Sequence, residues 1–209
     1  KGIFFENCFS PSFGTARGVF AILTGTPDVQ LGKFATRNEA SINQRSIIND
    51  FEGYEKFYFI GGRSQFNNFN GLVKNIQGIN IYEEGSYSSK KINVWGISDK
   101  SLFLEANQVI KKEKGPFIAV IQTAYNHRPY TIPKEDEAAI QQRSFPKDTL
   151  EKYGFWSDAE MNAFTYMDYT FKVFMQAASR EKYFNNTIFV FVGDHGIRGN
   201  AGNMMPQVW

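Results

Sequence analysis

The chain of 209 residues is long enough for one domain of ordinary size, or for a large part of a bigger one. Its formal net charge is only +2, so no basic surface points to nucleic acid, and its single cysteine excludes a disulfide framework and a multi-cysteine metal site. Hydrophobic residues make up 42% and charged residues 21% of the sequence, which is typical of a folded globular protein.

The first part of the chain alternates between predicted strands and predicted helices. Residues 2–9, GIFFENCF, are rich in aromatic side chains and predict a short strand. From Thr15 onward, apolar residues recur at helical spacing, and Gly25 is placed to end this helix. The next predicted elements are a short helix over 43–54, a strand over 56–62 and a helical segment over 66–76.

The second part of the chain continues the same alternation. Asp99 is a good N-cap for a helix over 100–115, and residues 116–125 form a near-continuous apolar strand of the kind buried on both faces of a parallel sheet. A polar loop over 126–157, a long helix over 158–183 and a last apolar strand over 187–196 follow. These elements predict an α/β fold with a doubly wound, mostly parallel central sheet and helices on both faces.

The last predicted strand runs directly into Gly-Asp-His-Gly, which places Asp194 and His195 at its carboxyl end. Ligands bind at that end of the strands in open α/β sheets. A carboxylate and a neutral imidazole are both good ligands for zinc, manganese and similar cations. The alternative is a surface turn, because Asp and Gly are common in turns.

Thr15 stands where a glycine-containing loop becomes the first predicted helix. A hydroxyl group there faces the free N–H groups and the positive end of the helix dipole, where an anion binds well. A nearby cation would also favour the alkoxide form of this hydroxyl. The alternative is that Thr15 only caps the helix, and the two interpretations are compatible because a capping geometry also directs the oxygen.

Four stretches occur in an order and spacing that resemble the alkaline phosphatase/sulfatase superfamily: FFENCFSPSFGTARGVFAILTG, WGISDKSLF, PFIAVIQTAYNHRPYTIP and IFVFVGDHG. The likeness is greatest to its lipoteichoic acid synthase-like branch, the membrane-anchored phosphoglycerol transferases. It implies the fold expected above and one sulfatase-like catalytic domain over 1–209, incomplete at both ends. It also implies a bacterial cell membrane protein whose catalytic domain faces the periplasm or the cell exterior.

The resemblance identifies the position of the nucleophile. Sulfatases carry a Cys or Ser in a C-x-P-x-R run, but Pro11 stands one place too late after Cys8, and Ser12 occupies the place of the arginine. Counting back from a Leu-Thr-Gly that resembles the sulfatase one, the nucleophile position falls on Thr15. Threonine cannot form the aldehyde of sulfatases, so the resemblance implies attack on phosphorus, and Cys8 is expected to be a small buried side chain.

The same resemblance implies that Thr15, Asp194 and His195 bind one divalent cation (Mn, Mg or Zn), with a further Glu or Asp ligand located before Lys1. The ligand atoms of these three residues should then lie within roughly 5 Å of one another. His127, in NHRPY, matches a family histidine that contacts the substrate phosphate or assists the leaving group.

The region around 60–69 departs from the family pattern. Phosphoglycerol transferases have His, Asp, Trp and Arg there for the glycerol phosphate headgroup, and the matching positions here are Ile60, Gly62, Asn67 and Phe69. Arg63 is the candidate that replaces them, as a fork-shaped donor to phosphate.

The expected function is metal-dependent transfer or hydrolysis of a phosphodiester or a phospholipid headgroup such as phosphoglycerol. The expected partners are therefore this substrate and the membrane, through segments outside the chain, and not nucleic acid. The alternatives are a sulfate ester hydrolase and a non-catalytic sulfatase-like binding module.

Overall fold

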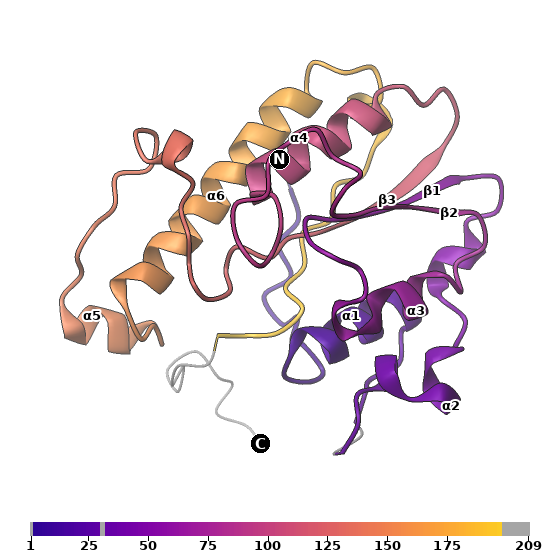
Figure 1. The fold of residues 1–209 in the computed structure, drawn as a ribbon, viewed down its shortest axis with the longest axis horizontal. Helices are drawn as coiled ribbons and strands as arrows, with labels where there is room; N and C mark the ends of the chain where they lie inside the picture. The colour runs from indigo at the N-terminus through magenta and orange to yellow at the C-terminus, as the bar shows by residue number, and fades with distance from the viewer. Residues whose placement is uncertain (1, 30–31, 198–209) are drawn as a thin grey trace. The chain divides into compact units, whose positions relative to one another are not determined.

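The computed structural model describes residues 2–29 and 32–197 (Figure 1). The chain divides into two compact units. Unit 1 contains the described residues of 1–53, 65–79 and 189–196, and unit 2 contains those of 54–64 and 80–188 together with Ile197. Within the described residues, every helix is too short or too polar to cross a lipid bilayer.

Helix α1 (Thr15–Thr24) is the main helix of unit 1 and confirms the prediction from helical spacing. Its apolar residues Val19, Phe20 and Leu23 are buried, which stabilises a helix that would be too short to persist alone in water. Gly25 ends the helix in the left-handed conformation, with φ of 68°, and its N–H donates to the carbonyl of Ala21 at 2.8 Å.

The rest of unit 1 consists of short helical pieces. They are α2 (Glu39–Ile42), α3 (Phe69–Val73) and three 3₁₀ turns, η1 (Ala35–Arg37), η2 (Ile47–Asp50) and η3 (Phe66–Asn68).

Two of the helices predicted in this region are shorter than expected. Only η2 forms within 43–54, because the Ser46 hydroxyl accepts from the N–H of Ile48 and donates to the carbonyl of Leu23 instead of leaving these groups to a longer helix. The segment 66–76 is interrupted at Asn67 and Asn68, whose φ values of 51° and 57° are left-handed. Asparagine tolerates this conformation better than most residues, so the chain bends there.

Unit 2 is built on a three-stranded sheet with the order β2-β1-β3. Strands β1 (Glu55–Ile60) and β3 (Phe117–Gln122) confirm two sequence predictions and pair in parallel, with Glu55 opposite Phe117 and Ile60 opposite Gln122. The short strand β2 (Ile79–Tyr82) was not predicted. The side chains of β1 are largely buried, whereas those of β3 are only partly buried, so burial of β3 on both faces was wrong.

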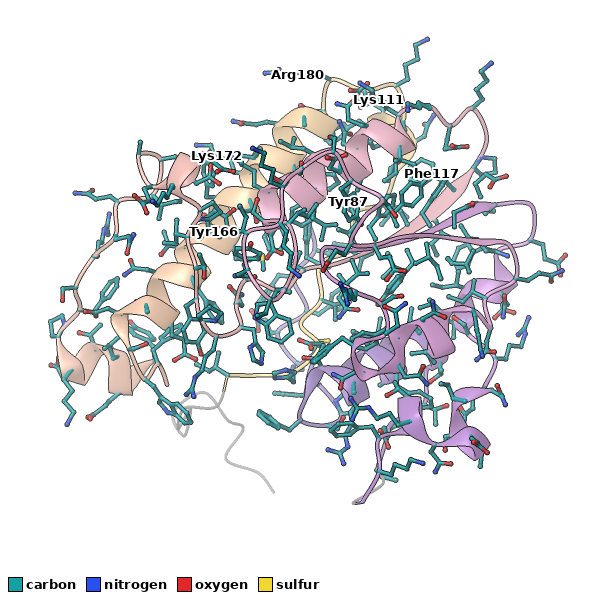
Figure 2. All side chains as sticks on the ribbon, viewed as in Figure 1. Tyr87, Lys111, Phe117, Tyr166, Lys172 and Arg180 are labelled. Carbon is teal, nitrogen blue, oxygen red and sulfur yellow. The ribbon has the colours of Figure 1, made fainter. Side chains whose placement is uncertain are left out.

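Helices α4 (Asp99–Ile110) and α6 (Asp158–Ala178) pack against each other in unit 2 (Figure 1). Leu102, Ala106 and Ile110 on α4 form one core with Phe57 and Phe59 of β1. Tyr87 and Phe117 pack against this core (Figure 2). Parallel strands covered by a helix confirm the predicted α/β class.

Both helices begin one residue after a serine N-cap. The Ser98 hydroxyl accepts from the N–H of Ser101, so Ser98 and not Asp99 caps α4, and Ser157 caps α6. Helix α6 ends at Ala178 rather than at residue 183. The loop predicted over 126–157 contains the turn η4 (Lys134–Asp136) and helix α5 (Lys147–Lys152), and η5 (Phe184–Asn186) follows α6.

The two predicted outer strands, 2–9 and 187–196, are absent from the described residues. Most of their apolar side chains are exposed to solvent, among them Phe4 to 85% and Ile188 to 90%. A strand needs a neighbour that pairs with its N–H and C=O groups, and no described strand pairs with either segment. Cys8 is also exposed, so the expectation of a buried thiol was wrong.

Candidate active site

Thr15 occupies the first turn of α1, immediately after the N-cap residue Gly14. Gly14 has φ of 98°, a conformation that only glycine adopts without strain, and its carbonyl accepts from the N–H groups of Arg17 and Gly18 at 3.0 and 3.1 Å. No side chain caps this helix, so the interpretation of Thr15 as a simple cap was wrong. Its hydroxyl contacts a histidine instead.

The Oγ1 atom of Thr15 lies 3.3 Å from Nε2 of His195, and both residues belong to unit 1. The other ring nitrogen, Nδ1, lies 2.8 Å from the carbonyl oxygen of Gly196. A carbonyl oxygen only accepts, so Nδ1 carries the hydrogen and neutral His195 presents its Nε2 lone pair to the Thr15 hydroxyl. The ring of Phe13 packs 5.0 Å from the imidazole and limits its rotation.

Asp194 completes this group. One carboxylate oxygen, Oδ1, accepts from the N–H of His195 at 3.0 Å, and Oδ2 lies 3.5 Å from Nε2 of His195. Two atoms that both present lone pairs repel each other at this distance unless a positive charge lies nearby.

The donor set therefore fits a divalent cation. Ligands of one first-row ion lie at about 2.0–2.2 Å from it, so two of them are at most about 4.4 Å apart. The separations of Nε2 from Thr15 Oγ1 and from Asp194 Oδ2, 3.3 and 3.5 Å, satisfy this limit. Among the residues that the structure describes, no three His, Cys, Asp or Glu side chains form a metal-binding group, so the site consists of two such residues and one hydroxyl.

Gly18 allows the Asp194 segment to lie directly against α1. A Cβ atom at Gly18 would overlap the carbonyl oxygen of Asp194 and would come within 2.9 Å of its Cβ. Glycine at this position therefore brings the Asp194–His195 pair to the N-terminal turn of the helix, where Thr15 lies. Sequence reasoning missed this role, although a glycine inside a predicted amphipathic helix is a signal of close backbone approach.

His127 belongs to unit 2, in the turn that follows β3. Its imidazole is exposed and lies 4.4 Å, between ring centroids, from the indole of Trp95. The structure thus groups Thr15, Asp194 and His195 within unit 1 and describes His127 separately. The sequence offered no sign of its contact with Trp95.

The turn that carries His127 is anchored by the buried carboxylate of Asp99. Its two oxygens accept from the N–H groups of Ala124 and Tyr125, both at 3.0 Å. Burial raises the pKa of Asp99 to about 6, although these two hydrogen bonds favour the ionised form. Asp99 is therefore a structural anchor rather than the helix cap that the sequence suggested.

Of the four positions that the resemblance assigns to the headgroup of phosphoglycerol transferases, Ile60 and Gly62 belong to unit 2, and Asn67 and Phe69 belong to unit 1. Ile60 and Phe69 are buried, and a Cβ at Gly62 would lie 2.8 Å from the carbonyl oxygen of Trp95. Asn67 accepts from Arg37 at 3.0 Å. The proposed replacement, Arg63, is exposed and pairs with Glu84, with Nε and Oε1 3.3 Å apart.

Comparison with known proteins identifies the family of the chain. Residues 1–207 match the Sulfatase family model. The chain is 26% identical over 167 residues to lipoteichoic acid synthase from Staphylococcus saprophyticus, which covers 78% of this chain and 24% of that protein.

Two solved structures share the fold. A protein in the alkaline phosphatase superfamily from Vibrio parahaemolyticus aligns with a TM-score of 0.66 and 23% identity, covering 84% of this chain and 41% of that one. The Streptococcus pyogenes phosphoglycerol transferase GacH, in complex with sn-glycerol-1-phosphate, aligns with a TM-score of 0.52 and 17% identity, covering 83% and 47%. The chain thus spans about a quarter of the curated relative and less than half of each structure. Since the family match extends over nearly all of its length, the chain belongs to the Sulfatase family.

Proposed function

We propose that this chain is the catalytic part of a metal-dependent phosphotransferase or phosphohydrolase that acts on a phosphodiester or a phospholipid headgroup such as phosphoglycerol. The observation that carries the proposal is the grouping of Thr15, Asp194 and His195 at the start of α1. The similarity to a lipoteichoic acid synthase and a phosphoglycerol transferase supports phosphorus, rather than sulfur, as the centre attacked.

Thr15, Asp194 and His195 are the residues that would hold the divalent cation (Mn, Mg or Zn). When bound, such an ion favours the alkoxide form of Thr15 and neutralises charge on the phosphate oxygens. His195 is suited to bind a cation because its Nδ1–H donates to the carbonyl oxygen of Gly196, which leaves a lone pair on Nε2.

Thr15 acts as the nucleophile. Its hydroxyl loses a proton to solvent, Oγ1 forms a bond to phosphorus, and the bond from phosphorus to the leaving alkoxide breaks. The leaving oxygen takes up a proton, and His127 is the residue assigned to assist it or to contact the phosphate. Water or an acceptor alcohol then attacks the same phosphorus, the Thr15–phosphorus bond breaks, and the threonine is restored.

The positions that the resemblance assigns to the headgroup carry other residue types here than in phosphoglycerol transferases. Ile60 and Phe69 are buried apolar side chains, and Arg63 is paired with Glu84, so these positions offer no open set of donors to a glycerol phosphate. The reaction at phosphorus does not depend on them. The proposed headgroup is therefore not restricted to phosphoglycerol by these positions.

The proposed location is the bacterial cell membrane, with the catalytic part facing the periplasm or the cell exterior, and the similarity to lipoteichoic acid synthase supports it. Protease added to intact spheroplasts should cleave this part of the protein. Protection of it from external protease would contradict the location and leave the chemistry untouched.

The nucleophile is tested with the intact protein and bis-p-nitrophenyl phosphate in the presence of Mn²⁺. Thr15→Ala should reduce turnover by several orders of magnitude, and Thr15→Ser should retain part of it, because only the second variant keeps a hydroxyl. Thr26→Ala, at an exposed threonine just after α1, is the matched control and should be as active as the unchanged protein.

Mass spectrometry of quenched reactions should show a peptide that contains Thr15 and carries a p-nitrophenyl phosphoryl group, because attack on the diester releases only one p-nitrophenolate. Undiminished turnover by Thr15→Ala would overturn the mechanism. An aldehyde at Cys8 together with release of sulfate from a sulfate ester would favour the sulfatase alternative instead.

A further inference from the structure

Two side chains of unit 2 converge on one backbone carbonyl oxygen, that of Arg128. The indole Nε1 of Trp95 lies 2.6 Å from this oxygen, and Nδ1 of His127 lies 3.1 Å from it. A carbonyl oxygen accepts two hydrogen bonds and donates none. Both nitrogens therefore carry their hydrogens toward it, and His127 is the Nδ1–H tautomer when neutral.

From this arrangement we propose that Trp95 is a positioning residue for His127, fixing both its tautomer and the direction of its ring. The importance of this role for turnover rests on the proposed function, in which His127 contacts the phosphate or assists the leaving group. The geometry of Trp95 and His127 does not depend on the proposed function.

Trp95 acts on His127 at two points. Its N–H holds the Arg128 carbonyl in the position that receives the imidazole Nδ1–H, and its ring packs against the imidazole with centroids 4.4 Å apart at 59°. Tilted contacts between aromatic rings stabilise the pair beyond the contribution from burial of their surfaces. The ring contact limits rotation of the imidazole, while the shared carbonyl selects the nitrogen that carries the hydrogen.

Trp95 is itself held in place by its neighbours in the chain and by close backbone contacts. Its backbone N–H donates to the side-chain oxygen Oδ1 of Asn93 at 2.8 Å. The next residue, Gly96, has φ of 99° and packs against the backbone of Gly61, at the end of β1. Gly62 also approaches the Trp95 carbonyl so closely that a Cβ would lie 2.8 Å from it. Trp95 therefore fixes the turn that carries His127 relative to the end of β1.

The turn has other anchors that do not involve Trp95. The carboxylate of Asp99 accepts from the N–H groups of Ala124 and Tyr125, and the Tyr130 hydroxyl donates to Glu160 at 3.0 Å. Loss of the indole should therefore release the His127 ring without releasing the turn. This separates a positioning role from a purely structural one.

The contact with the Arg128 carbonyl uses Nδ1 of His127, so Nε2 is the ring nitrogen that can act on a substrate. Neutral His127 offers the Nε2 lone pair as a hydrogen-bond acceptor, and protonated His127 offers an Nε2–H donor to a phosphate oxygen or a leaving alkoxide. Free histidine favours the opposite tautomer, with the hydrogen on Nε2. The contact with the Arg128 carbonyl is what reverses this preference.

The experiment measures ¹⁵N and ¹H shifts of the imidazoles in protein labelled with ¹⁵N-histidine. The chain contains only two histidines, and the signals of His127 are those that His127→Gln removes. In the unchanged protein at a pH where His127 is neutral, its ¹⁵N shifts should report Nδ1–H. Trp95→Leu should move them toward Nε2–H and remove the ring-current shift of its carbon-bound protons, while the His195 signals stay in place.

Two further variants make the test specific. Trp95→Phe keeps a ring but no N–H, so it should change the tautomer and preserve most of the ring-current shift. Trp156→Leu is the matched control, because Trp156 contacts the guanidinium of Arg128, at 5.6 Å from its ring centroid, and not the carbonyl. It should leave both readouts of His127 unchanged.

Nδ1–H shifts that persist in Trp95→Leu, or Nε2–H shifts in the unchanged protein, would overturn the proposal. In turnover assays Trp95→Leu should slow diesters with an alkyl leaving group more than those with p-nitrophenolate, which needs little assistance. An unchanged protein that turns over no phosphodiester would overturn the proposed function, while the nuclear magnetic resonance result would still decide the role of Trp95.

Discussion

Thr15 Oγ1 and His195 Nε2 lie 3.3 Å apart, although 180 positions separate the two residues in the chain. If these two atoms bind one cation together with Asp194, removal of either side chain should weaken binding of the cation. Thr15→Val and His195→Gln should each lower the affinity for Mn²⁺ by at least about tenfold, or about 1.4 kcal/mol, in titration calorimetry of the intact protein.

His127→Gln is the control for this measurement, because it removes the other histidine of the chain. It should bind Mn²⁺ as the unchanged protein does. Equal affinity in His195→Gln would contradict the cation site and leave only a hydrogen bond between the two side chains.

The close approach of Gly18 to Asp194 gives a prediction about stability. In Gly18→Ala the new methyl group would overlap the Asp194 carbonyl, and backbone cannot yield as a flexible side chain can. We expect a loss of about 1–3 kcal/mol in the free energy of unfolding, or displacement of the Asp194 segment with loss of turnover.

Gly115→Ala is the matched control for this substitution, since nothing lies within 4 Å of a Cβ built at Gly115. Urea unfolding and turnover of the two variants should be measured side by side. A Gly18→Ala protein with unchanged stability and unchanged turnover would show that the segment does not pack on α1 as described.

The buried carboxylate of Asp99 should make stability depend on pH. Burial raises its pKa from 3.8 to about 6, so between these values the folded protein retains a proton that the unfolded chain has released. The stability that Asp99 contributes is therefore fully present below about pH 4 and is lost as the pH rises through about 6. Two pKa units correspond to about 3 kcal/mol.

Urea unfolding between pH 4 and pH 7 tests this prediction when the unchanged protein is compared with Asp99→Asn. The variant should be less stable at pH 4, because an amide offers only one acceptor to the N–H groups of Ala124 and Tyr125. It should also lose the part of the pH dependence that Asp99 causes. Parallel curves for the two proteins would show that Asp99 does not titrate in this range.

Gly96 gives a prediction that joins stability to the position of His127. Its φ of 99° disfavours any side chain, and a Cβ there would overlap the carbonyl of Gly61. Gly96→Ala should therefore destabilise unit 2 and shift Trp95, so that the His127 resonances change as they do in Trp95→Leu. Gly85→Ala has a similar φ of 98° but open space around its Cβ, and it should leave the His127 resonances in place.

Elements with local signals could be predicted from the residues alone. Helix α1 with its terminal Gly25, strands β1 and β3, and helices α4 and α6 follow from apolar spacing and end signals, and all five are present. The order of the Thr15, His127 and Asp194–His195 motifs along the chain likewise indicates the family. These features depend on residue types and on neighbours within a few residues, so the sequence carries them directly.

Several features could not be read from neighbouring residues. The N-caps are Ser98 and Gly14 rather than Asp99 and Thr15, because the side chains of Asp99 and Thr15 are used by Ala124, Tyr125 and His195, which are distant in the chain. The apolar segment 187–196 reads as a strand, yet it pairs with no described strand.

Tertiary structure alone decided which groups meet. Gly18 brings Asp194 to α1, and the Arg128 carbonyl joins Trp95 to His127. Such contacts arise from close approach of backbone segments that are far apart in the chain, and a glycine or a carbonyl looks the same in sequence whether or not a partner reaches it. Local propensity therefore determined the helices and strands, and only long-range packing determined the site that they carry.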